Sequence, residues 1–210
     1  MLDLHQIFTF AIAAFLIVIV PGPNMTYLIS CAISQGKKGA IFALLGSNAA
    51  LLTLGIITGM GLSTLLKSVP VIYEALKIVG AFYLFWLAWK AIQSNKKDKI
   101  STVSVPQHSK GTLFKRGYLT NLLNPKSAAF YVAIFPEFLN VHNGYLVLQG
   151  AMLGLVHAVV SFIINGTIIL FVRQVALRVG SGNKLQVVKK WLTASIFTAF
   201  GIRMLLQKNN

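Results

Sequence analysis

Acidic residues are scarce in this chain. It has four Asp and Glu against 19 Lys and Arg, which gives a formal net charge of +15. Charged residues of either sign make up only 11% of the 210 residues, whereas a soluble domain carries about 25%. Hydrophobic residues reach 56%, and the mean hydropathy is +0.72. The chain lacks the polar surface of a soluble protein, so the basic charge does not indicate nucleic acid as a partner, and a lipid bilayer is the expected environment.

Several motifs of catalytic, redox and metal sites are also missing. Cys31 is the only cysteine, which excludes an intramolecular disulfide, a CxxC pair and a zinc ribbon. The chain contains no GxxxxGK sequence for ATP, no HExxH sequence and no clustered Cys and His ligands. We therefore expect neither an enzyme nor a bound cofactor or metal ion. Transport driven by an ion gradient requires none of these motifs.

Six apolar stretches approach the ~20 residues that a helix needs to cross a bilayer. They cover residues 7–33, 40–66, 71–92, 117–139, 145–172 and 191–206. The last stretch is short and contains Arg203, which would reach the membrane interface from near a helix end. The N-terminus has no basic segment and no small-residue cleavage site, so the first stretch is expected to persist as a helix. The sequence predicts an all-α membrane protein with six transmembrane helices.

Basic residues alternate between the connections that join these stretches. The first connection carries Lys37 and Lys38, and the third and fifth carry larger groups, whereas the fourth, at 140–144, carries none. The positive-inside rule then places the odd-numbered connections in the cytoplasm and both termini outside. Residues 94–113, a polar, basic and Ser-rich segment, would be a cytoplasmic linker.

This linker divides a single transmembrane domain, residues 1–210, into two halves of three spans, 7–93 and 114–206. Because each half has an odd number of spans, the second half enters the membrane upside down relative to the first. Such an arrangement is an inverted repeat. In both halves helix breakers interrupt the first span, and paired broken helices point to the substrate site of a transporter.

The two breaks have the sequences Pro21-Gly22-Pro23-Asn24 and Asn124-Pro125-Lys126. Pro23 and Pro125 suit the first position of a new half-helix, where the missing N–H is not needed. Asn124 would cap the second half-helix, and Gly22 would be the permissive cap of the first. The two half-helices would point their positive N-terminal ends at each other near mid-membrane and form an anion site. The alternative is a purely structural kink at each proline.

Lys126 adds a full positive charge beside the second break. The only acids lie near predicted helix ends or in loops: Asp3, Glu74, Asp98 and Glu137. A buried lysine without a partner is costly, and a substrate carboxylate would be a suitable partner. Asn24, Asn124 and Lys126 are therefore the expected substrate-binding residues. In the alternative, Lys126 extends to the cytoplasmic face or binds backbone carbonyls.

Small and polar residues of the fifth predicted span share one helical face: Gly150, Gly154, His157, Ser161 and Asn165. This face is expected to point into the bundle, with Gly150–Gly154 and Gly55–Gly59 allowing close helix packing. His157 is a candidate for proton coupling, with a packing role as the alternative. Ser161, Asn165 and Asn48 are candidate lining residues, although an interhelical hydrogen bond is the more ordinary role for Asn48.

At these motifs the chain resembles the lysine exporter and homoserine/threonine exporter (LysE/RhtB) family. The matching segments are Pro21-Gly22-Pro23-Asn24, Gly36-Lys37-Lys38-Gly39 with Gly46, Gly80-Ala81-Phe82-Tyr83-Leu84, Phe114-Lys115-Arg116-Gly117, Asn124-Pro125-Lys126 and Pro136-Glu137-Phe138. The resemblance implies a bacterial inner-membrane (plasma-membrane) protein that exports amino acids by proton antiport. Two positions depart from the family pattern: Ala50 replaces an expected glycine, and Asn24 replaces the aspartate of many members.

The predicted function is thus secondary active export of amino acids. A substrate with a second cation would need a compensating carboxylate, which no span interior supplies, so neutral zwitterionic amino acids are expected. A metal-ion or other small-solute exporter on the same fold is the alternative, although a metal-ion exporter should carry intramembrane carboxylates, thiols or several histidines. A membrane-embedded enzyme would need a catalytic pair or a dithiol. The oligomeric state stays open, a homo-oligomer included.

Overall fold

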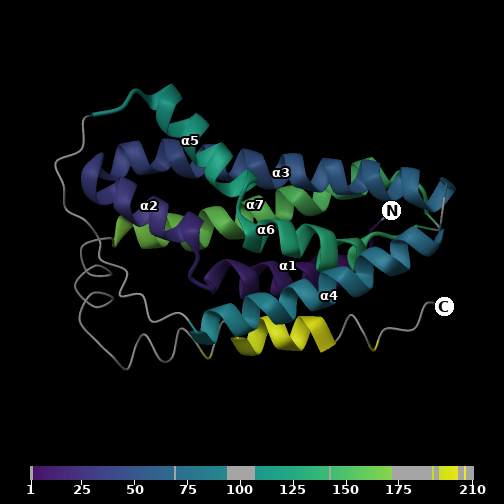
Figure 1. The fold of residues 1–210 in the computed structure, drawn as a ribbon. Coiled ribbons are helices and arrows are strands. Elements are labelled where there is room, and N and C mark those ends of the chain that lie inside the picture. Colours follow the sequence, from purple (N-terminus) through teal and green to yellow (C-terminus); the bar gives the residue numbers. More distant parts are fainter. Residues whose placement is uncertain are drawn as a thin grey trace.

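A computed structural model describes residues 2–68, 70–93, 107–141, 143–171, 191, 194–202 and 206. Within these ranges every regular element is a helix (Figure 1). The elements are α1 (Leu4–Ile19), α2 (Pro23–Ser34), α3 (Gly36–Ser68), α4 (Pro70–Gln93), α5 (Lys110–Leu122), α6 (Pro125–Ala129), the π-helix η1 (Phe130–Ile134), the 3-10 helix η2 (Phe135–Phe138) and α7 (Leu146–Leu170). Residues 194–202 are also helical.

These helices follow the predicted spans where the structure describes them. The pair α1 and α2 covers the first span, and α3, α4 and α7 cover the second, third and fifth. The fourth span is divided among α5, α6, η1 and η2. Its first helix starts earlier than the apolar run, at Lys110, because Ser109 caps it by accepting a hydrogen bond from the Thr112 amide at 3.3 Å. Residues 110–113 of the predicted linker are thus helical, while 94–106 and most of the fifth connection lie outside the described residues.

Two of the helices are long and apolar enough to cross a membrane: Gly36–Leu62 within α3, and α7. A third span results if α1 and α2 are counted together, since they bend by 63° at a short break. These numbers refer only to the part of the chain that the structure describes. They identify a multi-pass membrane protein.

The side chains of α7 are arranged as a bilayer requires. Its buried face carries the polar and small residues, including Gln149, His157, Ser161 and Asn165. Its exposed face carries large apolar side chains, among them Leu155 at 56% and Ile163 at 61% exposure. In water this distribution would be reversed, with the polar residues on the outer face. The predicted inward polar face of the fifth span is confirmed.

Glycines allow α3 to pack closely against two neighbours. On one side a Cβ at Gly46 would collide with the Phe114 carbonyl oxygen of α5. On the other side a Cβ at Gly55 or Gly59 would collide with carbonyl oxygens at the start of α7, and one at Gly150 would collide with the Gly55 carbonyl. The expected packing role of the paired glycines is confirmed, and it makes α3 the helix to which both α5 and α7 are joined.

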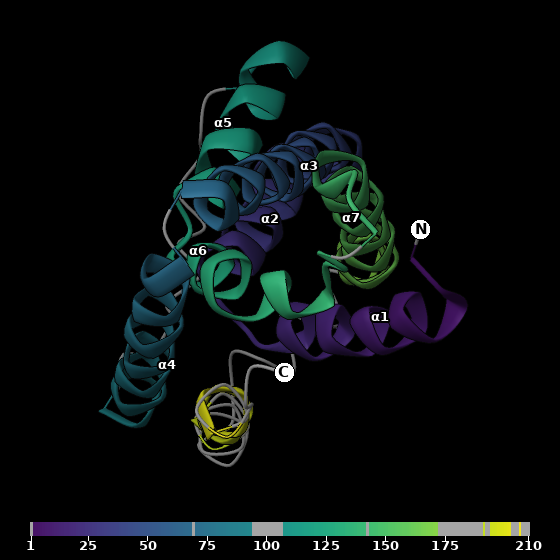
Figure 2. The same cartoon turned by 90° about the vertical axis from the view of Figure 1, so that its right-hand side faces the viewer.

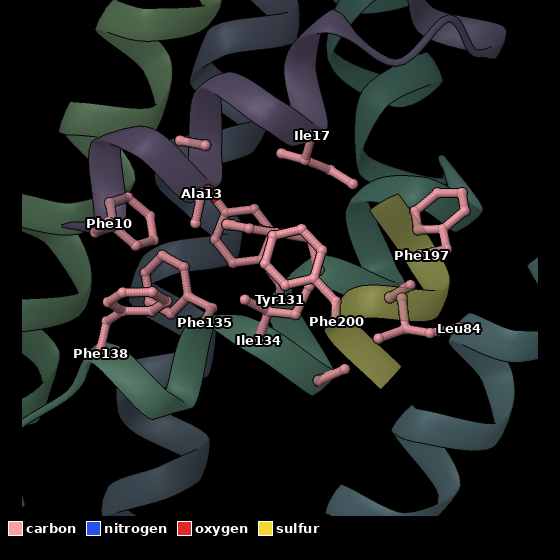
Figure 3. Packing of buried hydrophobic residues seen from close by; sticks show 14 of the residues in the cluster. Phe10, Ala13, Ile17, Leu84, Tyr131, Ile134, Phe135, Phe138, Phe197 and Phe200 are labelled. Carbon is pink, nitrogen blue, oxygen red and sulfur yellow. The ribbon is translucent and has the colours of Figure 1, made fainter. Parts of the chain in front are cut away.

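Viewed along the helices, α3, α7, α1 and the α6–η2 segment surround the centre of the molecule, with α5 outside α3 (Figure 2). Helix α4 and the helix at residues 194–202 lie on the far side of α6 and α1. An apolar core joins α1 to η1 and η2, with Phe10 packed edge-on against Phe135 and Phe138 at ring-centroid distances of 5.3 and 5.2 Å (Figure 3). Leu84 and Phe200 extend this core to α4 and to the C-terminal helix.

Candidate functional site

The first helix break lies between α1 and α2. Helix α1 ends at Ile19, and α2 begins at Pro23 with Gly22 as its N-cap. Gly22 has extended backbone (φ −161°) and no side chain to cap the new helix, as expected from the sequence. Pro21 has no N–H, so the Ile17 carbonyl, four residues earlier, loses the donor that a continuous helix would supply.

The second break lies between α5 and α6. Asn124 is the N-cap of α6, and its Oδ1 accepts a hydrogen bond from the Lys126 amide at 3.0 Å, which confirms the predicted cap. Pro125 occupies the first helical position. The Asn124 side chain is 1% exposed, and its Nδ2 has no hydrogen-bond partner among the described residues. A buried donor without a partner is uncommon, and this nitrogen can donate to a molecule that enters the site.

The Lys126 side chain joins the two breaks. Its Nζ donates hydrogen bonds to the carbonyl oxygens of Ile17 at 3.0 Å and Val20 at 2.7 Å. The ammonium group thus takes the place of the donor that Pro21 lacks. A Cβ at Gly22 would lie 3.5 Å from Lys126 Cε, so the glycine packs against the lysine side chain. The sequence left two alternatives to substrate binding for Lys126, extension to the cytoplasmic face and binding to backbone carbonyls. The structure contains the second.

A cavity of about 30 Å³ lies where the two breaks meet. It is lined by Ile17, Val18, Asn24, Met25, Leu51, Asn121, Asn124, Lys126, Ser127, Phe130, His157, Ser161 and Asn165. The residues predicted from the first break, the second break and the polar face of α7 are thereby brought together. None of these lining residues is an aspartate or a glutamate. Asn48 is not among them: it is 8% exposed on α3, and its Oδ1 is buried without a hydrogen-bond partner among the described residues.

Two polar lining residues were missed by the sequence reasoning, Asn121 and Ser127, as were the apolar ones. The Asn121 amide donates to the Ser47 carbonyl at 2.9 Å, and the Ser127 hydroxyl donates to Asn121 Oδ1 at 2.7 Å. The Ser47 hydroxyl donates to Asn24 Oδ1 at 3.1 Å. Asn121 therefore ties the first turn of α6 to α3, and Ser47 ties α3 to α2. Asn121, a polar residue inside an apolar stretch one turn before Asn124, was the available signal.

His157 is enclosed by aromatic rings. Its ring stacks on that of Tyr131 with centroids 5.6 Å apart and forms a T-shaped pair with Phe130 at a centroid distance of 4.9 Å. His157 Nδ1 lies 3.2 Å from the Tyr131 hydroxyl, which donates to the Leu51 carbonyl at 2.8 Å. Two turns along α7, the Asn165 amide donates to the Ser161 hydroxyl at 3.1 Å. Tyr131 was also missed, because nothing in an aromatic residue of an apolar stretch marks it as polar in function.

The helices and the site define a multi-pass membrane protein with a small polar cavity where two interrupted helices meet. The chain belongs to the LysE type translocator family, whose model matches residues 15–208. It is similar to the leucine efflux protein of Salmonella typhimurium, with 30% identity over 196 residues that cover 93% of this chain and 92% of the relative. The leucine efflux protein of Klebsiella pneumoniae is 29% identical over 198 residues, with the same coverage. No solved structure matches this chain.

Proposed function

We propose that this protein is a secondary active exporter of neutral, zwitterionic amino acids with apolar side chains, driven by proton antiport. The observation that carries the proposal is the cavity between the two breaks. It combines a lysine ammonium, a buried amide donor without a partner and an apolar wall, and none of its described lining residues is a carboxylate. The relatives named leucine efflux proteins support the same substrate class.

The substrate carboxylate is assigned to the side of the cavity formed by Lys126 and Asn124. Lys126 Nζ supplies a charge-assisted hydrogen bond, and Asn124 Nδ2 is a donor with no other partner among the described residues. The first turn of α2, which contributes Asn24 and Met25 to the lining, adds the partial positive charge of a helix N-terminus. Together these groups favour an anionic group over a neutral one.

The substrate side chain is assigned to the apolar part of the lining, which consists of Ile17, Val18, Met25, Leu51 and Phe130. These residues suit an aliphatic side chain. A lysine or arginine substrate would place a second cation in the same cavity as Lys126. Without a lining carboxylate, that cation would remain uncompensated at a cost of several kcal/mol.

The substrate ammonium requires hydrogen-bond acceptors. The backbone carbonyls of Ile17 and Val20, beside the first break, are bound by Lys126. The polar face of α7 offers further acceptors, with His157, Ser161 and Asn165 all lining the cavity. His157 is also the candidate for the coupling proton, since its imidazole is the lining side chain that ordinarily titrates near neutral pH.

The cavity must enlarge during transport. A volume of about 30 Å³ holds one or two water molecules and not an amino acid. Alternating access supplies such a change, because a rocking motion of one repeat against the other opens the site to one side at a time. When the site opens, Lys126 can exchange the carbonyl oxygens of α1 for the carboxylate of the substrate.

The proposal includes the predicted architecture: six transmembrane helices as two inverted three-helix repeats, residues 7–93 and 114–206, in one domain. Residues 94–113 would be the cytoplasmic linker, and both termini would lie outside the bacterial plasma membrane. The bent α1–α2 pair and the capped break at Asn124 support a broken first helix in each half. The alternation of basic connections supports the orientation.

The test is to load cells that lack the protein and cells that overproduce it with dipeptides of leucine, threonine, homoserine or lysine, and to measure the released amino acids. Release of leucine that depends on the protein is expected to exceed release of lysine. Preferential lysine release would contradict the charge argument. Among the described residues no three His, Cys, Asp or Glu form a group that could hold a metal ion, so no observation favours the metal-ion exporter.

A further inference from the structure

The contacts of the Tyr131 hydroxyl determine which nitrogen of His157 carries a proton. A phenol has one hydrogen to donate. In this structure it goes to the Leu51 carbonyl at 2.8 Å, and a carbonyl can only accept. The contact between Tyr131 and His157 Nδ1, at 3.2 Å, must therefore be donated by the imidazole. A neutral His157 is thus protonated at Nδ1 and carries its lone pair on Nε2.

We propose that Tyr131 is a positioning residue that holds His157 as the Nδ1–H tautomer, so that Nε2 is an acceptor for which the substrate ammonium and the coupling proton compete. The inference rests on the proposed amino-acid antiport. His157 lines the cavity, and its Nε2 makes no hydrogen bond within the ranges described. An N–H of the ammonium can donate to this nitrogen only while it is unprotonated.

This competition has the property that antiport requires. When a proton occupies Nε2, both ring nitrogens are donors, and the imidazolium repels an ammonium. Proton and substrate therefore exclude each other at one atom. Entry of a proton releases the substrate, and binding of the next substrate requires that the proton leave. If the histidine were in the other tautomer, Nε2 would carry the hydrogen and would be unable to accept from an ammonium.

The local helix geometry explains how Tyr131 reaches this position. Phe130 and Tyr131 are the first two residues of the π-helix η1, and both are at most 1% exposed. Phe130 lines the cavity and packs against the imidazole in a T-shaped arrangement, while Tyr131 stacks on the ring and reaches the Leu51 carbonyl of α3. Single π turns occur frequently at functional sites, where they change the direction of consecutive side chains.

Few charged or titratable groups surround His157. Tyr131 comes from η1, and Lys126, from α6, lines the same cavity. The other elements packed against the ring contribute apolar groups: α1 places Phe10 at a centroid distance of 6.3 Å, and α3 contributes Leu51. Among the described lining residues, Lys126 is thus the one other ionisable side chain, and its ammonium is assigned to the substrate carboxylate.

The first test measures the tautomer directly by ¹⁵N NMR of histidine-labelled protein in nanodiscs, with no substrate present. Comparison with His157→Gln identifies the resonance of His157 among the four histidines. The Nδ1–H form is expected to dominate, and Tyr131→Phe is expected to shift the tautomer ratio by about tenfold, the ordinary effect of one buried hydrogen bond. Dominance of Nε2–H in the unsubstituted protein would overturn the proposal.

The second test measures leucine binding to the same preparation between about pH 8 and pH 5, where histidine ordinarily titrates. Affinity is expected to fall on acidification, approaching about tenfold per pH unit once the proton occupies the site. In His157→Gln the affinity is expected to be independent of pH. In Tyr131→Phe binding at high pH is expected to weaken by up to about fivefold, because the apparent affinity follows the fraction of His157 in the accepting tautomer. A pH-independent affinity in the unsubstituted protein would overturn the competition between proton and substrate.

The matched control is Tyr118→Phe. The Tyr118 hydroxyl also donates a hydrogen bond to α3, to Thr53 Oγ1 at 3.3 Å, but Tyr118 does not line the cavity. This substitution is expected to preserve the tautomer and the pH dependence, and a Tyr118→Phe effect equal to that of Tyr131→Phe would reduce Tyr131 to a structural role. The two tests also separate the two proposals. If no amino acid binds or is exported, the proposed function fails, whereas the tautomer measurement still decides whether Tyr131 positions His157.

Discussion

Replacing Lys126 by methionine should separate transport from stability. Methionine keeps most of the length of the side chain but removes the ammonium. In the substituted protein Ile17 and Val20 lose the donor at 3.0 and 2.7 Å, and the substrate carboxylate loses its charged partner. Export is expected to fall severely, while insertion into the membrane and folding persist.

The expected magnitudes follow from these contacts. Two hydrogen bonds from a charged donor contribute about 1.5–3 kcal/mol each. Their loss is offset by removal of the several kcal/mol that a partly desolvated ammonium costs, so the net change in the free energy of unfolding should be small. No such offset applies to the transported substrate. Loss of one charge-assisted hydrogen bond to its carboxylate, about 1.5–3 kcal/mol, lowers export at limiting substrate by roughly 10- to 100-fold.

A second substitution isolates the contribution that Lys126 makes to stability at the first helix break. Pro21→Ala restores an N–H at the position that would pair with the Ile17 carbonyl in a continuous helix. The effect of Lys126→Met on the free energy of unfolding should be less unfavourable in this background than in the unsubstituted protein. A double-mutant cycle should give this difference, the coupling free energy, as about 1 kcal/mol. Export should remain low in the double variant, because the restored amide serves α1 and not the substrate.

Purified proteins in liposomes provide the assay, with labelled leucine for transport and thermal unfolding for stability. Lys90→Met is the matched control, since Lys90 lies over the Trp86 ring at 4.6 Å, outside the cavity lining. Undiminished export by a normally folded Lys126→Met protein would refute the assignment of Lys126 to the substrate. If Lys126→Met changes the free energy of unfolding equally in the unsubstituted protein and in Pro21→Ala, then Lys126 does not replace the backbone donor that Pro21 lacks.

Three further predictions concern packing, the outer connection and topology. Gly150→Ala should destabilise the protein by about 1–3 kcal/mol in thermal unfolding, because its methyl group would collide with a carbonyl of α3, whereas Gly61→Ala, with open space around it, should not. Gln149→Leu should leave the three backbone groups that its amide binds at 2.6–2.8 Å without their partner and increase hydrogen exchange at residues 140 and 144, and unchanged exchange would contradict this role. Reporter fusions after Asn210 should be active only outside the cytoplasm and fusions within residues 94–109 only inside, so a cytoplasmic C-terminus would contradict the six-span arrangement.

Local chemistry made the helix breaks and their caps predictable. Proline lacks a backbone donor wherever it stands, so the ends of α1 and α5 could be located from Pro21 and Pro125 alone. Asn124 was recognisable as a cap because its side chain bonds an amide two residues away. The inward face of α7 was predictable for a similar reason, since a helical period of 3.6 residues places the polar side chains on one side.

Contacts between distant residues could not be predicted in this way. Lys126 and Ile17 are 109 residues apart, and the sequence left open whether the lysine binds carbonyls, the interface or a substrate. Asn121 bonds Ser47 across 74 residues, and Tyr131 selects the tautomer of His157 from η1, whose π geometry no local pattern indicated.

The sequence by itself therefore determined the membrane class, the breaks, the caps and the polar face, because each depends on the backbone donors or the helical period of one short segment. Only the tertiary structure decided which carbonyls Lys126 binds, which asparagines complete the cavity and which nitrogen of His157 meets the Tyr131 hydroxyl. These depend on how closely segments far apart in the sequence approach one another, as α3 approaches α5 and α7 at its glycines, and no single segment contains that distance.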